Sequence, residues 1–191
     1  MGCRNRKARF KPGVYVFPGG MIERSDHFAR PATKLSSRFC AKMGVGNSPQ
    51  RAQALANGAI RETFEEVGLT LGLPVDFNTS SHADWRDFRD RRLAPNLGAL
   101  DYIGRAITPS HQPIRFDARF FSVAHEHIDG DIKDNGELTD LRWIRLSERD
   151  DFNMMKVTHL MLDTLHARLK KASAKAPFLY FNRRKSILRW T

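Results

Sequence analysis

Residues 58–69 read GAIRETFEEVGL, a run that places three glutamates close together in the chain. At about 100° per residue in an α-helix, Glu62, Glu65 and Glu66 fall within one arc of about 100°. The apolar residues of the run group on the opposite side: Ile60, Phe64 and Val67. The segment therefore predicts a helix with one acidic face and one face that packs into a core.

Helix-boundary signals flank this segment. Ser48 followed by Pro49 is typical of an N-cap and the first helical position, and Gly68 is typical of the residue that ends a helix. We expect a helix over residues 49–67.

The acidic face itself suggests metal binding. Carboxylates on one helix face repel one another, and a plain surface helix usually dilutes them with lysines four positions away. Oxygen ligands suit Mg²⁺ or Mn²⁺, and Mg²⁺ commonly binds a few carboxylates together with substrate phosphates. The residues alone leave an alternative open, in which the three glutamates form a solvated acidic surface.

Composition narrows the class of protein. The chain has 191 residues, 41% hydrophobic and 28% charged, which indicates one globular domain. Its apolar runs are far shorter than the roughly 18 residues needed to span a membrane. Lys and Arg exceed Asp and Glu by 32 − 21 = 11, which predicts an anionic partner: nucleic acid, an acidic membrane surface or a phosphorylated small molecule. The two cysteines, Cys3 and Cys40, suit a reducing cytosol.

The remaining pattern mixes strands and helices. We expect strands over residues 13–17, 99–107, 114–123 and 137–144, and helices over 35–42, 86–92 and 159–169. In the strand over 137–144 the expected buried side chains are Leu138, Leu141, Trp143 and Ile144. The Arg/Asp-rich helix over 86–92 is expected to be solvated, with anion binding as the alternative. Residues 177–181 are expected to form an edge strand or to contact a partner.

Residues 61–69 resemble the second half of the signature of the Nudix hydrolase family, G-x5-E-x7-R-E-U-x-E-E-x-G-U with U apolar. Thr63 stands at the first U position. Gly20 and Asp26 are similar to the first half, although the family has Glu where this chain has Asp26. Between Asp26 and Arg61 lie 34 residues instead of 7, so the signature is split by 34 − 7 = 27 residues. We interpret residues 27–57 as an insertion leading into the acidic helix, either a lid or surface padding.

A split signature resembles the branch of the family that cleaves coenzyme A and acyl-coenzyme A. That branch has an upstream pattern, L-L-T-x-R-[SA]-x3-R-x3-G-x3-F-P-G-G, which Arg4, Arg9, Gly13 and residues 17–20 match. Asn5 departs from it. The family's opening strand would lie before residue 1, so the resemblance implies an opening strand truncated at the N-terminus. The expected domain covers residues 1–171, with residues 172–191 as a C-terminal tail.

The resemblance also implies a fold and a site. The fold is an α/β/α sandwich with a mixed sheet, and the acidic helix borders the cleft. Glu62, Glu65 and Glu66 would hold Mg²⁺ or Mn²⁺ together with the backbone carbonyl of Gly19. Arg61 would orient the neighbouring carboxylates. Glu62 or Glu65 would take a proton from the attacking water, with Glu126 and Glu137 as weaker alternatives. Arg4 and Arg9 would bind either the adenosine 3′-phosphate or the diphosphate, and Gly20 would also contact the substrate, although the basic N-terminal residues can also be a frayed terminus.

The implied activity is metal-dependent hydrolysis of a diphosphate in coenzyme A or acyl-coenzyme A, giving 3′,5′-adenosine bisphosphate and a 4′-phosphopantetheine product. One alternative is a dinucleotide or nucleotide sugar as substrate. The other is a polyanion-binding module without catalysis, which the charge of +11 motivates and the three glutamates oppose. The expected partner is a small diphosphate, without membrane or nucleic acid. A cytoplasmic protein is expected, and a homodimer is left open.

Overall fold

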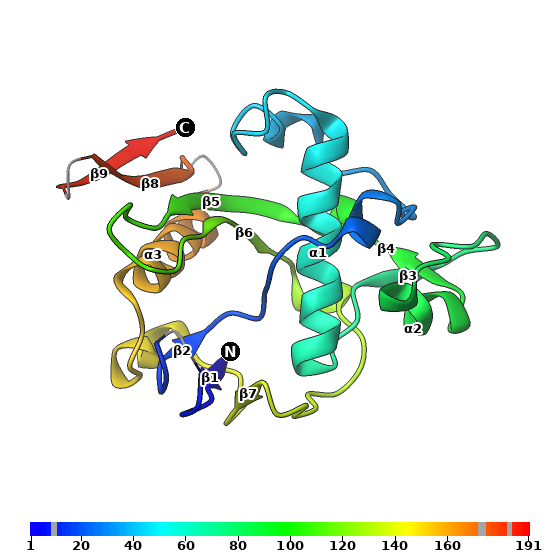
Figure 1. Cartoon of the computed structure of the whole chain (residues 1–191), viewed down its shortest axis with the longest axis horizontal. Helices are drawn as coiled ribbons and strands as arrows, with labels where there is room; N and C mark the ends of the chain where they lie inside the picture. The colour runs from blue at the N-terminus through cyan, green and yellow to red at the C-terminus, as the bar shows by residue number, and fades with distance from the viewer. Residues whose placement is uncertain (9–10, 172–174, 183–184) are drawn as a thin grey trace.

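The computed structural model describes residues 1–8, 11–171, 175–182 and 185–191. A long helix, α1 (Pro49–Val67), stands between a four-stranded sheet on one side and a smaller α/β unit on the other (Figure 1). Two helices complete the set of α-helices in these residues, α2 (Arg86–Asp90) and α3 (Lys156–Lys170). The architecture is therefore α/β, as the sequence predicts.

The largest sheet has the order β6-β5-β8-β9. Its strands are β5 (Asp101–Ile107), β6 (Asp117–Ser122), β8 (Pro177–Asn182) and β9 (Lys185–Trp190). The strands β5 and β6 pair antiparallel, which confirms that the two predicted strands are neighbours, whereas β5 and β8 pair parallel. The sheet is therefore mixed, as expected.

The C-terminal residues correct the sequence prediction. We expected an edge strand or a partner contact over residues 177–181, in a C-terminal tail outside the domain. In the structure β8 lies between β5 and β9, so β9 forms the edge and both strands belong to the main sheet. The physical reason is the apolar run PFLYF, which suits an interior strand. There its backbone amides and carbonyls can form hydrogen bonds with a neighbouring strand on each side.

Two smaller sheets lie at the ends of the molecule. One has β1 (Gly2–Arg4) between β2 (Tyr15–Val16) and β7 (Leu138–Thr139), and the other pairs β3 (Gly72–Pro74) with β4 (Leu93–Pro95). Short 3-10 helices connect the elements: η1 (Arg24–His27), η2 (Ser37–Phe39), η3 (Ala83–Trp85), η4 (Leu97–Ala99), η5 (His125–His127) and η6 (Leu146–Asp151). The helix predicted over residues 35–42 is present only as the short η2. The helix predicted over 86–92 to be solvated is α2, which buries Phe88.

The strand predicted over residues 137–144 ends early. Leu138 is buried as expected, but Trp143 is 61% exposed and packs against the ring of His125. Asp140 has a φ of 50°, a left-handed conformation that stops the regular alternation of a strand. The prediction that Trp143 is buried is therefore wrong.

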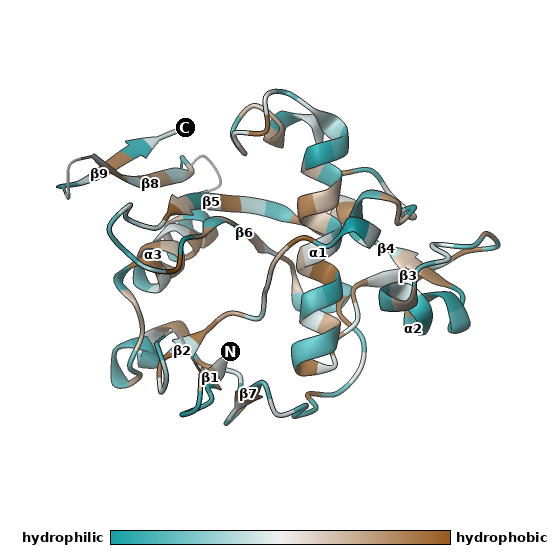
Figure 2. Ribbon diagram, in the orientation of Figure 1, coloured by the Kyte–Doolittle hydropathy of each residue, from teal (hydrophilic) through white to brown (hydrophobic). Residues whose placement is uncertain are grey.

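Helix α1 follows its sequence signals closely. The hydroxyl of Ser48 accepts a hydrogen bond from the amide of Arg51, and Gly68 ends the helix with a φ of 76°. Hydrophobic and hydrophilic bands alternate along it (Figure 2), and its buried apolar residues include Ala52, Ala56 and Ile60. This packing fixes which way the acidic face points.

The insertion contributes to the core. Phe39, Met43 and Val45 are buried in one cluster with Ala52 of α1 and Tyr102 of β5. Met43 is fully buried. Because these side chains pack between α1 and the sheet, part of the insertion over residues 27–57 belongs to the core.

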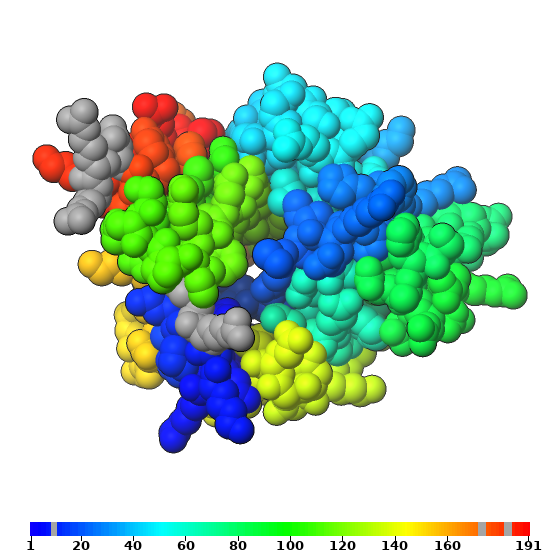
Figure 3. Space-filling view, viewed as in Figure 1, coloured from blue at the N-terminus to red at the C-terminus, as the bar shows by residue number. Residues whose placement is uncertain are grey.

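No described helix has the length and apolar character required to cross a membrane. The space-filling view shows a hollow between the loop that joins β5 to β6 and the blue segment that follows β2 (Figure 3).

Candidate active site

Asp26 and Arg61 form a buried ion pair that joins the two halves of the split signature. The guanidinium donates from Nε to Asp26 Oδ1 at 2.9 Å and from Nη2 to Asp26 Oδ2 at 3.1 Å. Asp26 is fully buried and the Arg61 side chain is 4% exposed. Asp26 Oδ2 also accepts the amide of Glu23 at 2.8 Å. A bidentate pair of this kind fixes the plane and position of the guanidinium.

The same guanidinium reaches two glutamates of α1. Arg61 Nη1 lies 3.0 Å from Glu62 Oε1 and 2.7 Å from Glu65 Oε2. Arg61 therefore contacts three carboxylates at once, which limits the positions that Glu62 and Glu65 can take.

Glu62 packs against the Gly19-Gly20 turn. A Cβ placed on Gly20 would lie 2.5 Å from Glu62 Oε2, so only glycine allows this close approach. The Glu62 side chain is 14% exposed. The turn and the helix thus share a narrow contact surface.

Glu66 is held by the same turn. Its Oε2 accepts the Gly19 amide at 2.7 Å, and the residue is only 8% exposed. Gly19 has a φ of 152°, a conformation that favours glycine. The contact runs through the Gly19 amide, and the role of the Gly19 carbonyl as a metal ligand stays a proposal.

The glutamates of α1 resist ionisation. Burial raises the pKa of Glu66 to about 7, and the like charges of Glu62 and Glu137 add to this, while the hydrogen bond from Gly19 opposes it. Burial also raises the pKa of Glu62 and of Glu65, with Arg61 acting in the opposite direction. A bound cation would lower all three pKa values, because it stabilises the charged carboxylates.

The structure brings a fourth acid to this group. Glu137, in the loop that enters β7, raises the pKa of both Glu62 and Glu66 through its charge. The other weak alternative, Glu126, is 79% exposed and lies 3.9 Å from the ring nitrogen of His127. Of the two, only Glu137 is electrostatically coupled to the glutamates of α1.

Comparison with known proteins agrees with the family resemblance of the sequence. No protein-family model matches the chain. A crystal structure of a Nudix hydrolase from Alicyclobacillus acidocaldarius matches with a TM-score of 0.63 and 28% identity, covering 87% of this chain and 82% of that one. Acyl-coenzyme A diphosphatase NUDT19 from Xenopus laevis is 28% identical over 207 residues, which is 81% of this chain and 54% of the relative. The chain thus spans about half the length of this curated relative.

The chain is similar in sequence and in fold to Nudix hydrolases. The Nudix fold match and the mixed sheet agree with the predicted fold class.

The donor chemistry of the acidic group fits a divalent cation, since carboxylate oxygens gather beside the glycine turn with raised pKa values. Among the residues that the structure describes, no three His, Cys, Asp or Glu side chains are arranged so that they could hold a metal ion. All three expected glutamate ligands have other partners, Arg61 for Glu62 and Glu65 and the Gly19 amide for Glu66. The ligand set of Glu62, Glu65 and Glu66 therefore stays a proposal.

Of the predicted substrate-binding residues, Arg4 lies in β1. Its charge lowers the pKa of Glu66, so it lies on the side of the acidic group. Its Nε is buried without a hydrogen-bond partner in the described part of the chain. Gly20 contacts Glu62 as described above. Arg9 lies outside the described residues.

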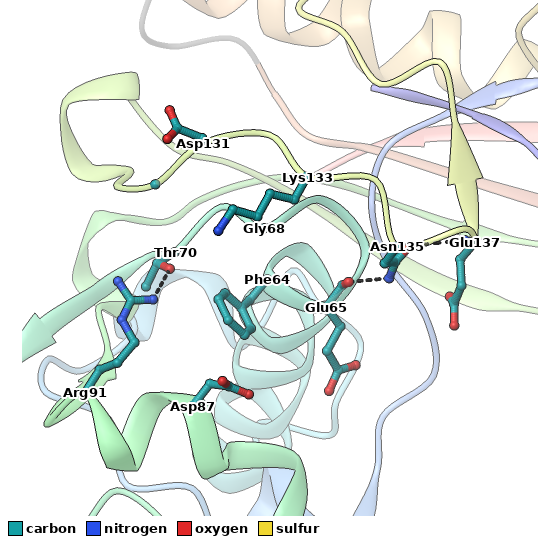
Figure 4. A pocket seen from close by; sticks show the side chains of 11 residues that line it. Phe64, Glu65, Gly68, Thr70, Asp87, Arg91, Asp131, Lys133, Asn135 and Glu137 are labelled. Atoms are coloured by element: carbon teal, nitrogen blue, oxygen red, sulfur yellow. Dashed lines mark hydrogen bonds between the residues drawn. The ribbon is translucent and has the colours of Figure 1, made fainter.

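A pocket of about 820 Å³ opens beside Glu65. Figure 4 shows side chains from the end of α1, from α2 and from the loop before β7 around it. Sequence reasoning missed Lys133 as a site residue because it stands in a loop without a motif, and it considered Arg91 only within the helix over 86–92.

Proposed function

We propose that this chain hydrolyses a diphosphate linkage in coenzyme A or an acyl-coenzyme A, giving 3′,5′-adenosine bisphosphate and a 4′-phosphopantetheine product. The observation that carries the proposal is the contact between the Gly19-Gly20 turn and the carboxylates of Glu62 and Glu66. Buried carboxylates with raised pKa values are costly for folding, and such groups concentrate at functional sites.

A divalent cation, Mg²⁺ or Mn²⁺, would be held by Glu62, Glu65 and Glu66 with the Gly19 carbonyl. When bound, it supplies charge neutralisation of the diphosphate and a water of lowered pKa. Arg61 is a positioning residue, because its contacts with Glu62 and Glu65 hold both carboxylates while Asp26 holds the guanidinium. Glu62 or Glu65 accepts the proton of the attacking water.

The substrate class is supported by the similarity to an acyl-coenzyme A diphosphatase and by the charge of +11. Arg4 supports it as well, since its unpartnered Nε lies on the side of Glu66 and a guanidinium pairs readily with phosphate oxygens. We assign Arg4 to the diphosphate.

The test incubates the purified protein with coenzyme A, acyl-coenzyme A, dinucleotides and nucleotide sugars, each with Mg²⁺, with Mn²⁺ and with chelator. We expect 3′,5′-adenosine bisphosphate from the coenzyme A substrates only when metal is present. Faster turnover of a dinucleotide or nucleotide sugar would assign the site to that substrate class instead.

Matched variants examine the residue roles. Glu62→Gln and Glu65→Gln keep the size of each side chain but remove its charge, and we expect each to lower turnover about a hundredfold or more while the fold is retained. Glu126→Gln is the control, because that side chain is 79% exposed and pairs with His127. Salt-sensitive DNA binding without product release under any metal condition would favour a polyanion-binding module over an enzyme.

A further inference from the structure

The pocket beside Glu65 has an acidic side and a basic side. Glu65 and Glu137 lie at one side, and Lys133 and Arg91 lie at the other, across the ring of Phe64 (Figure 4). Its volume of about 820 Å³ is within the range of small-molecule sites. Because Glu65 belongs both to this pocket and to the acidic group of α1, the pocket extends the candidate active site.

Lys133 is fixed by its backbone. Its amide donates to Val67 O at 3.0 Å, at the end of α1, and the neighbouring residues Thr70 and Asp129 exchange two backbone hydrogen bonds of 2.8 and 2.9 Å. A Cβ on Gly68 would lie 3.1 Å from the Cβ of Lys133, which shows how closely the loop packs on the helix end. The ammonium group of Lys133 extends into the pocket (Figure 4) and has no hydrogen-bond or ion-pair partner among the described residues.

Arg91 is held on the same side of the pocket as Lys133. Its Nη1 donates to Thr70 Oγ1 at 2.9 Å, and its Nη2 lies 3.8 Å from the exposed carboxylate of Asp129. The side chain is 42% exposed, so most donors of the guanidinium are available to a ligand. Thr70 thus orients the Arg91 side chain beside the same loop that carries Lys133.

We propose that Lys133 and Arg91 bind a phosphate group of the substrate that lies outside the scissile diphosphate. This inference rests on the proposed function, which places the diphosphate at Glu62 and Glu66. In a coenzyme A substrate the further phosphate is the 3′-phosphate of the adenosine moiety. A guanidinium and an ammonium group both form charge-assisted hydrogen bonds with phosphate oxygens.

Two other acids line the pocket, Asp87 and Asp131, and neither forms an ion pair with Lys133 or Arg91 among the described residues. The Asp131 carboxylate points away from Lys133 (Figure 4), and Asp87 is exposed on α2 below Phe64. A cation beside Lys133 and Arg91 would be repelled by both positive charges. A free ammonium group beside a guanidinium instead favours an anion.

The experiment compares coenzyme A with 3′-dephospho-coenzyme A, which differ only in the proposed phosphate. We expect the wild-type protein to show a higher kcat/KM for coenzyme A. Lys133→Ala should lower kcat/KM for coenzyme A about tenfold, mainly through KM, and change it less than twofold for the dephospho substrate. Lys156→Ala, an exposed lysine on α3 outside the pocket, is the matched control and should change neither.

Arg91→Ala should act like Lys133→Ala, whereas Arg4→Ala should weaken both substrates, because we assign Arg4 to the diphosphate. An equal loss on both substrates in Lys133→Ala, or no loss on either, would overturn the proposal. A binding measurement separates it from the proposed function, since it needs no turnover. We expect 3′,5′-adenosine bisphosphate to bind wild type about tenfold more tightly than it binds Lys133→Ala, and 5′-adenosine monophosphate to bind both equally. If the protein lacks hydrolase activity but keeps this pattern, only the proposed function fails.

Discussion

Asp26 holds the guanidinium of Arg61 through two hydrogen bonds, although 35 positions separate the two residues in the chain. The pair connects η1 to α1, and Arg61 in turn contacts Glu62 and Glu65 and restricts their positions. The insertion between the two residues leaves this connection intact because its own apolar side chains pack into the core.

Asp26→Asn is expected to destabilise the fold strongly. It leaves Arg61 buried without a full countercharge, and breaking one partner of a buried pair costs about 3 to 5 kcal/mol. Urea unfolding of the metal-free protein measures the change. Asp76→Asn, at an exposed aspartate, is the control and should shift stability by less than about 0.5 kcal/mol. A loss for Asp26→Asn no larger than that of the control would show that the pair does not stabilise the fold.

Gly20→Ala is expected to reduce turnover more than it reduces stability. The new methyl group would overlap the carboxyl group of Glu62 and displace it from the turn. Steady-state kinetics should show a loss of about a hundredfold, since small displacements of reacting groups have effects of that size. Met21→Ala changes a neighbouring side chain that is 69% exposed and should leave kcat within about twofold. Normal activity in Gly20→Ala would contradict the assignment of Glu62 to the active site.

Met43→Ala is expected to lower the free energy of unfolding by about 2 to 5 kcal/mol, because it leaves a cavity between η2 and β5. Thermal or urea unfolding provides the measurement. Lys42→Ala, an exposed side chain next to it, is the comparison. If the two variants were equally stable, residues 27–48 would have to be a surface addition.

The stability of the metal-free protein is expected to fall as pH rises from about 5 to 8. Burial raises the pKa of Glu66 from 4.5 to about 7, so the folded state binds this proton more tightly than the unfolded state does. Between these two values the folded state holds more protons, and the free energy of unfolding decreases with pH, by up to about 3 kcal/mol for this group.

Glu66→Gln isolates the contribution of Glu66, since the amide can still accept the Gly19 hydrogen bond but does not titrate. Its pH profile in chelator should be flatter than that of the wild type over the same range. Added Mg²⁺ or Mn²⁺ should restore wild-type stability at pH 8 and have a smaller effect on the variant. Parallel profiles would contradict the raised pKa.

The elements that were predicted well have local causes. Helix α1 has the predicted ends, because Ser48, Pro49 and Gly68 act through contacts within one turn of the helix. The β5–β6 pair is similarly local, since a short connection joins neighbouring antiparallel strands. The acidic face of α1 follows from helix periodicity alone.

The elements that were missed depend on distant partners. The place of β8 is set by parallel pairing with β5, across some 70 residues of intervening chain, which no local pattern encodes. Trp143 fits a strand pattern, but the left-handed Asp140 turns the chain before it. Lys133 becomes a candidate phosphate-binding residue only when its loop packs against the end of α1.

The position of β8 also bears on the order of assembly. During translation β5 and β6 emerge from the ribosome well before β8. The amides and carbonyls on one edge of β5 therefore stay unpaired until β8 has emerged. A nascent chain of this kind presents an open sheet edge, to which a chaperone or another copy can bind until the native partner arrives.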